Sequence, residues 1–401
     1  MKKDITQIFE NFLKTNSIFE DKKLLQPNYT PETIPHREEE IEQIAKILAP
    51  SLKLNKPSNI FIYGKTGTGK TLCVKHTINK INKIATEVRL PIKTIYINCK
   101  LKKISDTEYR LIAQIIREFG KEIAATGLPT EEIYKTFFNI IDSKKQIIIL
   151  VLDEIDQLVK KAGDEILYNL TRINSETKES QISIIGISND FIFRDILDPR
   201  IKSSLSEEEI IFKPYNALQL QEILYSRAKY AFKKNVIEQG VIEKCAAYAA
   251  REHGDARRAL ELLRVAGEIA DRENSETLKI KHLDEAEDKL ERDRITEIIT
   301  AQPKQFQAVL YAVILLSTKN NKIIETGELY NLYRKICFDI GLRCLTQRRV
   351  SDVISELDML GIINARTISK GRYGRTREIS LAINSNAEEK VKTLLEKELG
   401  C

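Results

Sequence analysis

The octapeptide GKTGTGKT at residues 64–71 constrains this chain more than any other feature of its sequence. It fits the pattern GxxxxGK[ST] and lies between a short apolar stretch, NIFIYG at 59–64, and a helical pattern at 71–85. A strand, a glycine-rich turn and a helix in this order form the context in which the pattern binds phosphate. Backbone amides of the turn and of the helix N-terminus then converge on anionic oxygens. We therefore expect a nucleotide site in an α/β domain.

Two side chains of this loop carry its chemistry. The ammonium of Lys70 can reach the β and γ phosphates of a nucleotide, and the hydroxyl of Thr71 can ligate Mg²⁺. The backbone would supply the other phosphate contacts. The expected nucleotide-binding residues of the loop are Gly64, Lys65, Thr66, Gly67, Thr68, Gly69, Lys70 and Thr71.

Three later stretches predict the rest of a sheet. KTIYINC at 93–99 is typical of a second strand, while QIIILVLDEID at 146–156 and QISIIGISND at 181–190 are nearly continuous apolar runs. Such runs are typical of parallel strands that are covered on both faces. The sequence therefore predicts a parallel sheet in an α/β domain.

Polar side chains end the last two of these strands. Asp153 would hold Mg²⁺, mostly through water, and Glu154 would orient or deprotonate an attacking water molecule. Asn189 would position the same water from the other side. For Asn189 an ordinary turn asparagine is the alternative, because its residue type is common in turns.

Beyond residue 213 the pattern is helical only, until about residue 295. We expect an all-α lid that follows the α/β domain. Arg257, in HGDARRAL, lies at the start of a predicted lid helix. Its guanidinium could clamp the γ phosphate and tie the lid angle to the nucleotide state, whereas a plain surface arginine is the alternative.

Composition places the chain in a broad class. Its 401 residues are enough for two or three domains, and no run of 18 apolar residues or secretory leader is apparent. We expect a soluble intracellular protein without a membrane partner. The six cysteines are scattered without metal-ligand spacing, so reduced thiols are the simplest interpretation. A formal net charge of +6 is modest, and its distribution matters more than its sum.

Six motifs in sequence order identify a known family. PHREEEI, GKTGTGKT, LVLDEID, GISND, LDPRIKSSL and HGDARRAL resemble those of the replication-initiator group of AAA+ ATPases, most closely the archaeal family related to origin recognition complex and cell-division-cycle loader proteins. The resemblance covers nearly the whole chain. It implies an α/β AAA+ P-loop ATPase domain with a parallel sheet, an all-α lid domain and a C-terminal winged-helix domain.

The change of pattern along the sequence predicts where these domains begin and end. The ATPase domain would take residues 1–213, with an N-terminal segment and an initiator-specific insertion at about 100–145 that can touch DNA in the family. The helical lid domain would take residues 214–295. The winged-helix domain would take residues 296–401.

Position by position, the resemblance assigns roles to the motifs. Lys70 and Thr71 would be the Walker A residues, Asp153 and Glu154 Walker B, Asn189 sensor 1 and Arg257 sensor 2. Further expected nucleotide contacts are Pro35, His36 and Arg37 near the adenine, and Tyr215 and Arg227.

Arg200, in LDPRIKSSL, would reach the γ phosphate of a neighbouring subunit. Relatives that carry a second arginine have it where this chain has Ser204, which puts a strong trans-acting finger in doubt. An arginine that tethers its own domain is the alternative for Arg200.

A winged helix at residues 303–381 would contain three helices and two strands. The helical patterns lie at 303–317, 326–341 and 346–361, and the strands of the wing at 362–369 and 376–383. The third helix would be the recognition helix, with Arg348 and Arg349 near its N-terminus, where such helices meet bases and phosphates.

The wing carries a concentration of positive charge. The segment from Arg366 to Arg377 has five Lys or Arg residues and no acid, which predicts salt-dependent binding to phosphates. Two glycines permit a tight tip that can enter a groove. The expected DNA-binding residues are Arg348, Arg349, Lys370, Arg372, Tyr373 and Arg375. A merely solvated hairpin tip is the alternative.

The resemblance implies an ATP-regulated, DNA-binding initiator of DNA replication that recognises origin duplex. Its implied cofactors are ATP or ADP and Mg²⁺, with slow ATP hydrolysis serving a nucleotide switch. Its implied partners are double-stranded origin DNA, a replicative helicase of the minichromosome-maintenance type that it helps to recruit or load, and other copies of itself on DNA. We expect a cytoplasmic, nucleoid-associated protein.

Two other classes of protein remain open at the level of sequence. One is a P-loop kinase or metabolic NTPase whose tail is incidental. The other is a different winged-helix AAA+ or signalling ATPase, such as a plasmid or mobile-element regulator. A helicase motor is disfavoured, because the sequence has one P-loop and no second ATPase repeat.

Overall fold

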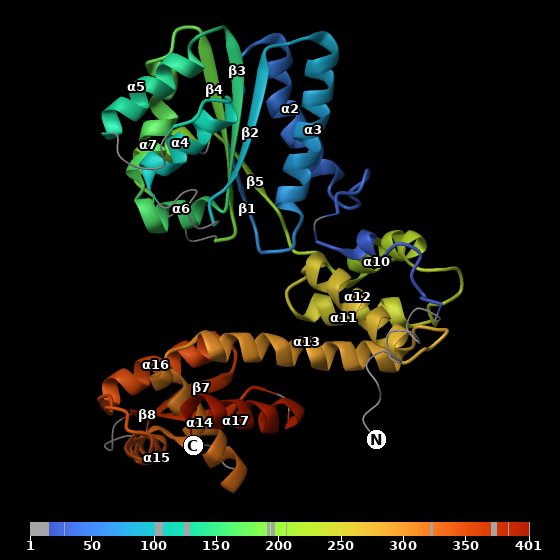
Figure 1. Cartoon of the computed structure of the whole chain (residues 1–401), viewed down its shortest axis with the longest axis vertical. Helices are drawn as coiled ribbons and strands as arrows, with labels where there is room; N and C mark the ends of the chain where they lie inside the picture. The colour runs from blue at the N-terminus through green and yellow to red at the C-terminus, as the bar shows by residue number, and fades with distance from the viewer. Residues whose placement is uncertain are drawn as a thin grey trace. The chain divides into compact units, whose positions relative to one another are not determined.

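The computed structural model of the protein describes residues 16–27, 29–100, 107–123, 129–190, 193, 197–205, 207–320, 324–369, 375–383 and 385–400 (Figure 1). Its contacts divide the chain into two units, Met1–Ile280 and Lys281–Cys401. The expected lid boundary at 295 falls inside a single helix, α13 (Ile280–Ala301). The end of the lid at this residue stays a prediction. Within the described residues, the structure has no helix that is both long and apolar enough to span a bilayer.

The first unit contains a five-stranded parallel sheet with the strand order β2-β3-β4-β1-β5, which confirms the predicted α/β class. The last strand, β5, is an edge strand with exposed glutamates, and it was not predicted from the sequence. The strands are β1 (Ile60–Tyr63), β2 (Ile92–Asn98), β3 (Gln146–Asp153), β4 (Ser180–Ser188) and β5 (Glu208–Ile211).

Helices cover both faces of this sheet (Figure 1). Alternate side chains of each strand point to opposite faces, so two separate apolar layers form. One layer joins Ile60, Ile62 and Ile149 to α2 and α3. The covering helices of this face, with a 3-10 turn after the first, are α2 (Glu38–Leu48), η2 (Ala49–Lys53) and α3 (Lys70–Val88).

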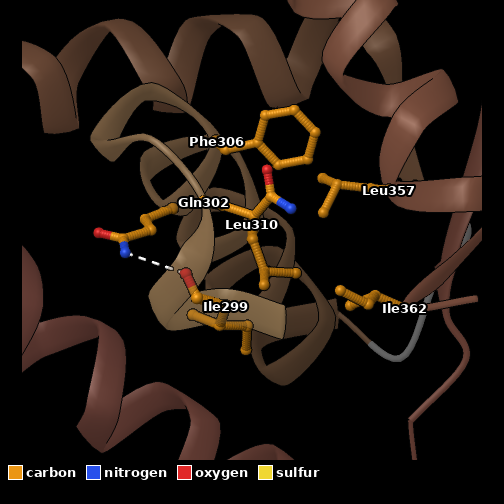
Figure 2. A pocket seen from close by; sticks show the side chains of 7 residues that line it. Ile299, Gln302, Phe306, Leu310, Leu357 and Ile362 are labelled. Carbon is orange, nitrogen blue, oxygen red and sulfur yellow. Dashed lines mark hydrogen bonds between the residues drawn. The ribbon is translucent and has the colours of Figure 1, made fainter. Parts of the chain in front are cut away.

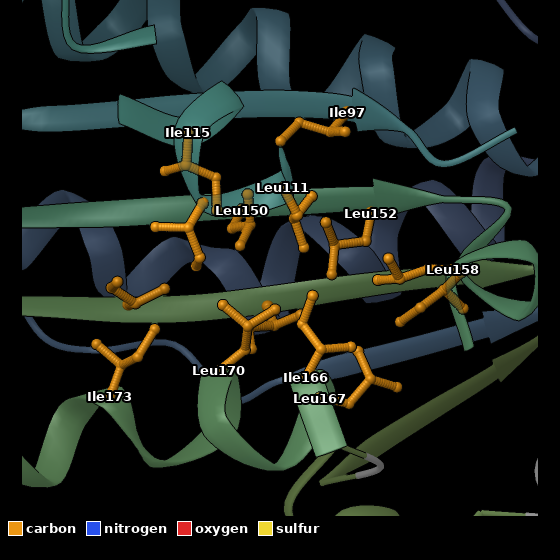
Figure 3. Close-up of a cluster of buried hydrophobic side chains, with 14 of the residues drawn as sticks. Ile97, Leu111, Ile115, Leu150, Leu152, Leu158, Ile166, Leu167, Leu170 and Ile173 are labelled. Carbon is orange, nitrogen blue, oxygen red and sulfur yellow. The ribbon is translucent and has the colours of Figure 1, made fainter. Parts of the chain in front are cut away.

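The second apolar layer lies on the opposite face of the sheet. Leu150 and Leu152 of β3 pack there against Leu111, Leu158 and Leu167, and Figure 3 shows these side chains converging from both sides of the layer. The helices that cover this face are α4 (Glu108–Glu118), α5 (Thr130–Ile141), α6 (Ile155–Ala162), α7 (Glu165–Arg172), η3 (Ile173–Ser175) and α9 (Pro199–Leu205). Of these, α4 and α5 come from the expected insertion.

Three helices follow the sheet in the same unit and form the lid: α10 (Ala217–Ala231), α11 (Val241–Arg251) and α12 (Ala256–Arg272). Asn216 and Gln219 form a capping box at the start of α10. At the start of α12 the carboxylate of Asp255 accepts the backbone N–H groups of Arg257 and Arg258. Such caps satisfy donors that a helix leaves unpaired, and they fix where each helix begins.

The first described residues belong to the lid rather than to the sheet. The ring of Phe19 stacks on Phe232 with centroids 4.7 Å apart, and the N–H of Ile18 donates to Asp271 at 2.8 Å. The ammonium of Lys22, in η1 (Lys22–Leu25), lies 2.8 Å from Glu268. These contacts make residues 17–25 an added layer of the lid, which is named the N-terminal strap from here on.

The second unit has the winged-helix fold that the resemblance implies. Its antiparallel sheet has the order β6-β8-β7, and α17 packs on α14. The short strand β6 and helix α17 were not predicted. The elements of this unit are α13, α14 (Lys304–Asn320), β6 (Ile324–Glu325), α15 (Thr326–Asp339), α16 (Gln347–Met359), β7 (Ile363–Ser369), β8 (Arg375–Leu381) and α17 (Ser385–Leu399).

The core of this unit is closely packed. Phe306 and Leu310 of α14 converge with Leu357 of α16 on a narrow gap that has no room for a water molecule (Figure 2). The amide of Gln307 donates to the carbonyl of Ile299 at 3.0 Å beside this gap. The gap is therefore part of the hydrophobic core that holds α16, the predicted recognition helix, against α14, and it is not a ligand site.

Candidate functional site

The predicted phosphate-binding loop joins β1 to α3. Gly67 and Gly69 have φ values of 69° and 94°, a region that side-chain-bearing residues rarely adopt. Lys70 is the first residue of α3, so the loop leads directly into a helix N-terminus. The ammonium of Lys70 donates to the carbonyls of Gly64 and Lys65 at 2.7 Å each. These contacts hold the lysine within the loop, where an incoming phosphate would meet it.

The environment of Lys70 already disfavours its positive charge. Burial lowers the pKa of Lys70 to about 8, against the opposing effect of the carboxylate of Asp153, while the charge of Arg257 lowers it further. An anion placed beside this buried ammonium would favour its charged form. The site is thus suited to a phosphate group beside Lys70.

Asp153, at the end of β3, is buried and accepts three hydrogen bonds. Its Oδ2 atom receives the hydroxyl of Thr71 at 2.9 Å, and its Oδ1 atom receives the backbone N–H of Glu154 at 3.0 Å. The third donor is the phenol of Tyr96, at 2.5 Å from Oδ2. The structure therefore brings together the two residues that the sequence assigned to the metal, Thr71 and Asp153.

Tyr96 is a site residue that the sequence analysis missed. It lies on β2, where the register places Asn98 opposite Asp153 and Tyr96 opposite Val151. Burial and the nearby charge of Asp153 raise the pKa of Tyr96, so its phenol is a donor at neutral pH. No local motif marks this residue; the only signal was that Tyr96 and Asn98 share one face near a strand end.

Glu154 and Asn189 follow the ends of adjacent strands. Glu154 adopts a left-handed conformation with φ of 55°, and its carboxylate lies 3.8 Å from the ammonium of Lys100. Asn189 directly follows β4 and is half-buried. Between them the hydroxyl of Ser188 donates to the buried carboxylate of Asp156 at 3.1 Å. Asp156, which the sequence did not mark as a site residue, thereby connects α6 to the end of β4, directly before Asn189.

The lid touches the phosphate-binding loop through the start of α12. The backbone N–H of Ala256 donates to the carbonyl of Gly67 at 3.2 Å. A Cβ atom built on Gly67 would lie 1.7 Å from Oδ1 of Asp255, so only glycine fits beneath this cap. Arg257 is exposed, and its charge acts on Lys70. The lid is therefore closed onto the loop, with the predicted sensor arginine close to it.

Arg37 joins three parts of the first unit. Its Nε donates to the carbonyl of Thr68 at 2.9 Å, and its Nη2 donates to the carbonyl of Lys213 at 2.5 Å. Its guanidinium also lies over the ring of Tyr215, 4.0 Å from the centroid, and 2.9 Å from Glu40. Arg37 thus connects the loop to the segment that leads into the lid, while its predicted contact with the adenine stays a prediction.

The other predicted nucleotide residues lie on the lid side of this junction. His36, beside Pro35, lies 3.0 Å from Glu222 of α10. Tyr215 is buried, its hydroxyl lies 2.9 Å from the Cβ position of Gly69, and burial raises its pKa to about 12. Arg227 of α10 lies over the ring of Tyr29 at 4.6 Å, and its buried Nη1 has no hydrogen-bond partner.

Arg200 is exposed and pairs within its own domain. Its Nε and Nη2 atoms donate to the two carboxylate oxygens of Asp198 at 3.0 and 2.9 Å, and its guanidinium lies 5.2 Å from the ring centroid of Tyr168. Such a fork-shaped pair holds the guanidinium in one direction. The geometry suits a tether, and a role towards a neighbouring subunit stays a prediction.

The predicted DNA-binding residues fall on α16 and on the wing. Arg348 and Arg349 are exposed at the N-terminus of α16, where Thr346 caps the helix. Lys370, Arg372 and Tyr373 lie outside the described residues, and Arg375 begins β8.

One cation of the wing has an internal role. The guanidinium of Arg377, in β8, donates to the carbonyl of Ser351 at 3.0 Å and to the hydroxyl of Ser355 at 2.7 Å. Both acceptors belong to α16. This arginine therefore fixes the base of the wing against the recognition helix.

The donor set of the first unit fits a magnesium nucleotide. Hydroxyl and carboxylate oxygens are the ligands that Mg²⁺ prefers, and Thr71 and Asp153 place one of each within 2.9 Å. The unpartnered Nη1 of Arg227 and the buried ammonium of Lys70 are donors suited to a polar or anionic ligand. The residues present therefore suit both the nucleotide and the metal.

Family models match three consecutive parts of the chain. An AAA domain matches residues 54–192, a Cdc6 AAA+ ATPase-type lid domain matches residues 221–288, and a CDC6 C-terminal winged helix domain matches residues 297–391. The first of these is a family of nucleotide-binding ATPases, in agreement with the geometry of the loop.

Two proteins of similar sequence and one solved structure match the chain over nearly its whole length. The ORC1-type DNA replication protein of Pyrococcus abyssi is 52% identical over 383 residues, which is 94% of this chain and 91% of that protein. ORC1-type DNA replication protein 1 of Methanosarcina acetivorans is 49% identical over 386 residues, covering 96% and 92%. The Aeropyrum pernix ORC1 protein, solved in complex with DNA, is 42% identical with a TM-score of 0.82, covering 96% and 98%. This chain belongs to the family of ORC1-type DNA replication proteins, the archaeal initiators of the AAA+ class.

Proposed function

We propose that this protein is an ATP-regulated initiator that binds origin duplex through its winged helix and changes its DNA-bound state with the nucleotide. Family membership supports the replication role over a metabolic NTPase or a mobile-element regulator. The observation that carries the regulatory part is the contact between lid and loop, in which Ala256 donates to Gly67 at 3.2 Å.

The nucleotide would bind in the loop at residues 64–71. Lys70 would exchange its carbonyl partners for phosphate oxygens, and the ligands for Mg²⁺ would be Thr71 and Asp153. When bound, the metal would neutralise charge on the phosphates. Glu154, in reach of the same edge of the sheet, would accept a proton from an attacking water that Asn189 helps to orient.

The lid would respond to what the loop holds. Asp255 and Ala256 touch Gly67 directly, and Arg257 lies close enough for its charge to act on Lys70. A γ phosphate would attract Arg257, whereas its loss would leave the arginine without this partner. Because α12 carries these residues and α13 follows the lid in the chain, a nucleotide-dependent lid position would be passed on to the winged helix.

DNA would be bound by the second unit. Exposed Arg348 and Arg349 at the start of α16 would contact bases or phosphates in the major groove, and the cationic tip of the wing would follow the backbone or the minor groove. Support comes from the Aeropyrum pernix ORC1 protein, whose structure was solved in complex with DNA. Such binding would place the protein at the nucleoid.

Two further partners belong to the proposal. A replicative helicase of the minichromosome-maintenance type would be recruited by the DNA-bound protein, and further copies of the chain would assemble on the same DNA. Arg200 would contribute to that assembly if it exchanged Asp198 for a neighbouring nucleotide. A co-sedimentation experiment with the helicase and origin duplex tests the first, and a comparison of wild type with Arg200→Ala on DNA tests the second.

The main test measures DNA affinity in three nucleotide states. Fluorescence anisotropy of duplexes from around the protein's own gene, against a shuffled duplex at fixed salt, would be recorded without nucleotide, with ADP and with ATP. We expect a preference for one duplex and an affinity or footprint that differs between ADP and ATP. The Lys70→Ala variant should bind DNA without any nucleotide effect. Equal binding in all three states by the wild type would contradict the switch, and equal weak binding to every duplex would contradict sequence recognition.

A further inference from the structure

The carboxylate of Asp153, a proposed metal ligand, accepts three hydrogen bonds. Oδ2 accepts from Thr71 and from Tyr96, and Oδ1 accepts the N–H of Glu154. A carboxylate has about four lone-pair positions, so these bonds leave little freedom for rotation. Its direction in the site is therefore fixed before any nucleotide arrives.

The three donors differ in what they do when a metal binds. The hydroxyl of Thr71 is itself a proposed metal ligand, and the N–H of Glu154 belongs to the adjacent peptide. Only the phenol of Tyr96 comes from another strand and has no expected contact with the nucleotide. It is therefore the donor that can hold the carboxylate independently of the ligand.

Tyr96 is itself held in place. The ammonium of Lys75, on α3, lies 4.2 Å from the centroid of its ring. Asn98, two residues further along β2, accepts the N–H of Lys100 through its Oδ1 atom at 2.9 Å. Tyr96 is thus held near the end of β2, with its hydroxyl directed at the carboxylate of Asp153.

We propose that Tyr96 is a positioning residue for Asp153 and that its hydroxyl raises the affinity of the nucleotide site for Mg²⁺. The inference rests on the proposed nucleotide function of this site. Groups that hydrogen-bond a metal ligand from outside fix its direction, and their loss typically weakens metal binding by about 10- to 100-fold. Phenylalanine at this position would keep the ring and remove only the hydroxyl, so this substitution isolates the role of the hydroxyl.

The test compares Tyr96→Phe with wild type and with a matched control. Tyr134 also donates its phenol to a carboxylate at 2.5 Å, that of Glu108, but in the contact between α4 and α5. Tyr134→Phe therefore removes the same kind of bond away from the loop. Binding of a fluorescent ADP analogue is titrated with Mg²⁺ and, separately, in excess EDTA, and the thermal midpoint of each variant without nucleotide reports folding.

We expect Tyr96→Phe to need roughly 10-fold more Mg²⁺ for half-maximal effect on ADP affinity, with unchanged affinity in EDTA. Tyr134→Phe should follow the wild type in both titrations. An unchanged or lower Mg²⁺ requirement in Tyr96→Phe would overturn the proposal, as would an equal shift in Tyr134→Phe. Failure of the wild type to bind the ADP analogue would instead overturn the nucleotide site, and the role of Tyr96 with it.

Discussion

The carboxylate of Asp255 lies so close to Gly67 that a Cβ atom on this glycine would fall 1.7 Å from Oδ1. The aspartate cannot easily move, because it caps α12 through the N–H groups of Arg257 and Arg258 at 2.8 and 3.2 Å. Lid and phosphate-binding loop therefore meet so closely that residue 67 has no room for a side chain. This contact gives the loop a direct mechanical connection to the lid.

The first prediction concerns Gly67→Ala. The new methyl group must push Asp255 away, so we expect the lid to be displaced and ADP affinity to fall by at least about 10-fold, equal to about 1.4 kcal/mol. Isothermal titration calorimetry measures this. Gly163→Ala is the matched control, since Gly163 also has positive φ, of 82°, but has open space around it. Gly163 has ψ of 172°, a combination that is essentially restricted to glycine, so the control should lose about 1–3 kcal/mol of stability and keep its ADP affinity. Equal loss of affinity in both variants would contradict the clash.

The second prediction concerns Arg37→Ala. The buried guanidinium donates to the carbonyls of Thr68 and Lys213 and pairs with Glu40, so its removal leaves acceptors without partners. We expect a loss of about 3 kcal/mol of stability, seen as a thermal midpoint lower by about 5 °C or more. Arg200→Ala is the control, because Arg200 also pairs with a carboxylate and lies over a tyrosine but is exposed. A midpoint as high in Arg37→Ala as in Arg200→Ala would show that the junction is not held by Arg37.

The third prediction is a pH dependence that involves Asp142. This carboxylate follows α5 and accepts the backbone N–H groups of Lys178, Glu179 and Ser180, which hold its pKa below the usual 3.8. A group with a depressed pKa in the folded state contributes stability above its unfolded pKa and loses it as the pH falls through the folded value. Asp142→Ala should therefore lower the thermal midpoint at pH 7, by about 2 °C, and by less at pH 3. A constant difference between the two pH values would contradict the assignment.

The fourth prediction separates two arginines of the winged helix by salt dependence. Arg348 is exposed on α16, so Arg348→Ala should lower DNA affinity and reduce the slope of log affinity against log salt by about 1. Arg377 donates to Ser351 and Ser355 within the unit. Arg377→Ala should weaken binding with little change of slope, because it removes no phosphate contact. Anisotropy titrations at several salt concentrations measure both, and a slope change in Arg377→Ala as large as in Arg348→Ala would contradict the internal role.

Elements with strong local signals could be predicted from the sequence. The apolar run before Asp153 predicted β3, and the pattern after the glycine-rich loop predicted α3, each with ends close to those observed. The three helices and two strands of the winged helix were equally well marked by their periodicity. In each case the signal lies within a short stretch of chain, because burial of one face imposes a regular pattern.

The features that were missed depend on contacts between distant residues. Tyr96 reaches Asp153 across 57 residues, and Arg37 reaches the carbonyl of Lys213 across 176 residues. Strand β5 is an edge strand in which only Ile210 is buried, so its pattern resembles that of a charged loop. Nothing in the sequence near these residues records the partner, since the partner is selected by the tertiary fold.

The N-terminal strap has a consequence for the order of events during synthesis. Ile18 is paired with Asp271, which the ribosome adds 253 residues later, and Phe19 stacks on Phe232. The sheet can therefore be completed while the strap is still without its partners. Apolar Ile18 and Phe19 would stay in contact with solvent or with a chaperone until the lid emerges. The N-terminal strap is thus synthesised early but reaches its native contacts only once the lid has formed, and a nascent chain stopped before the lid would expose it.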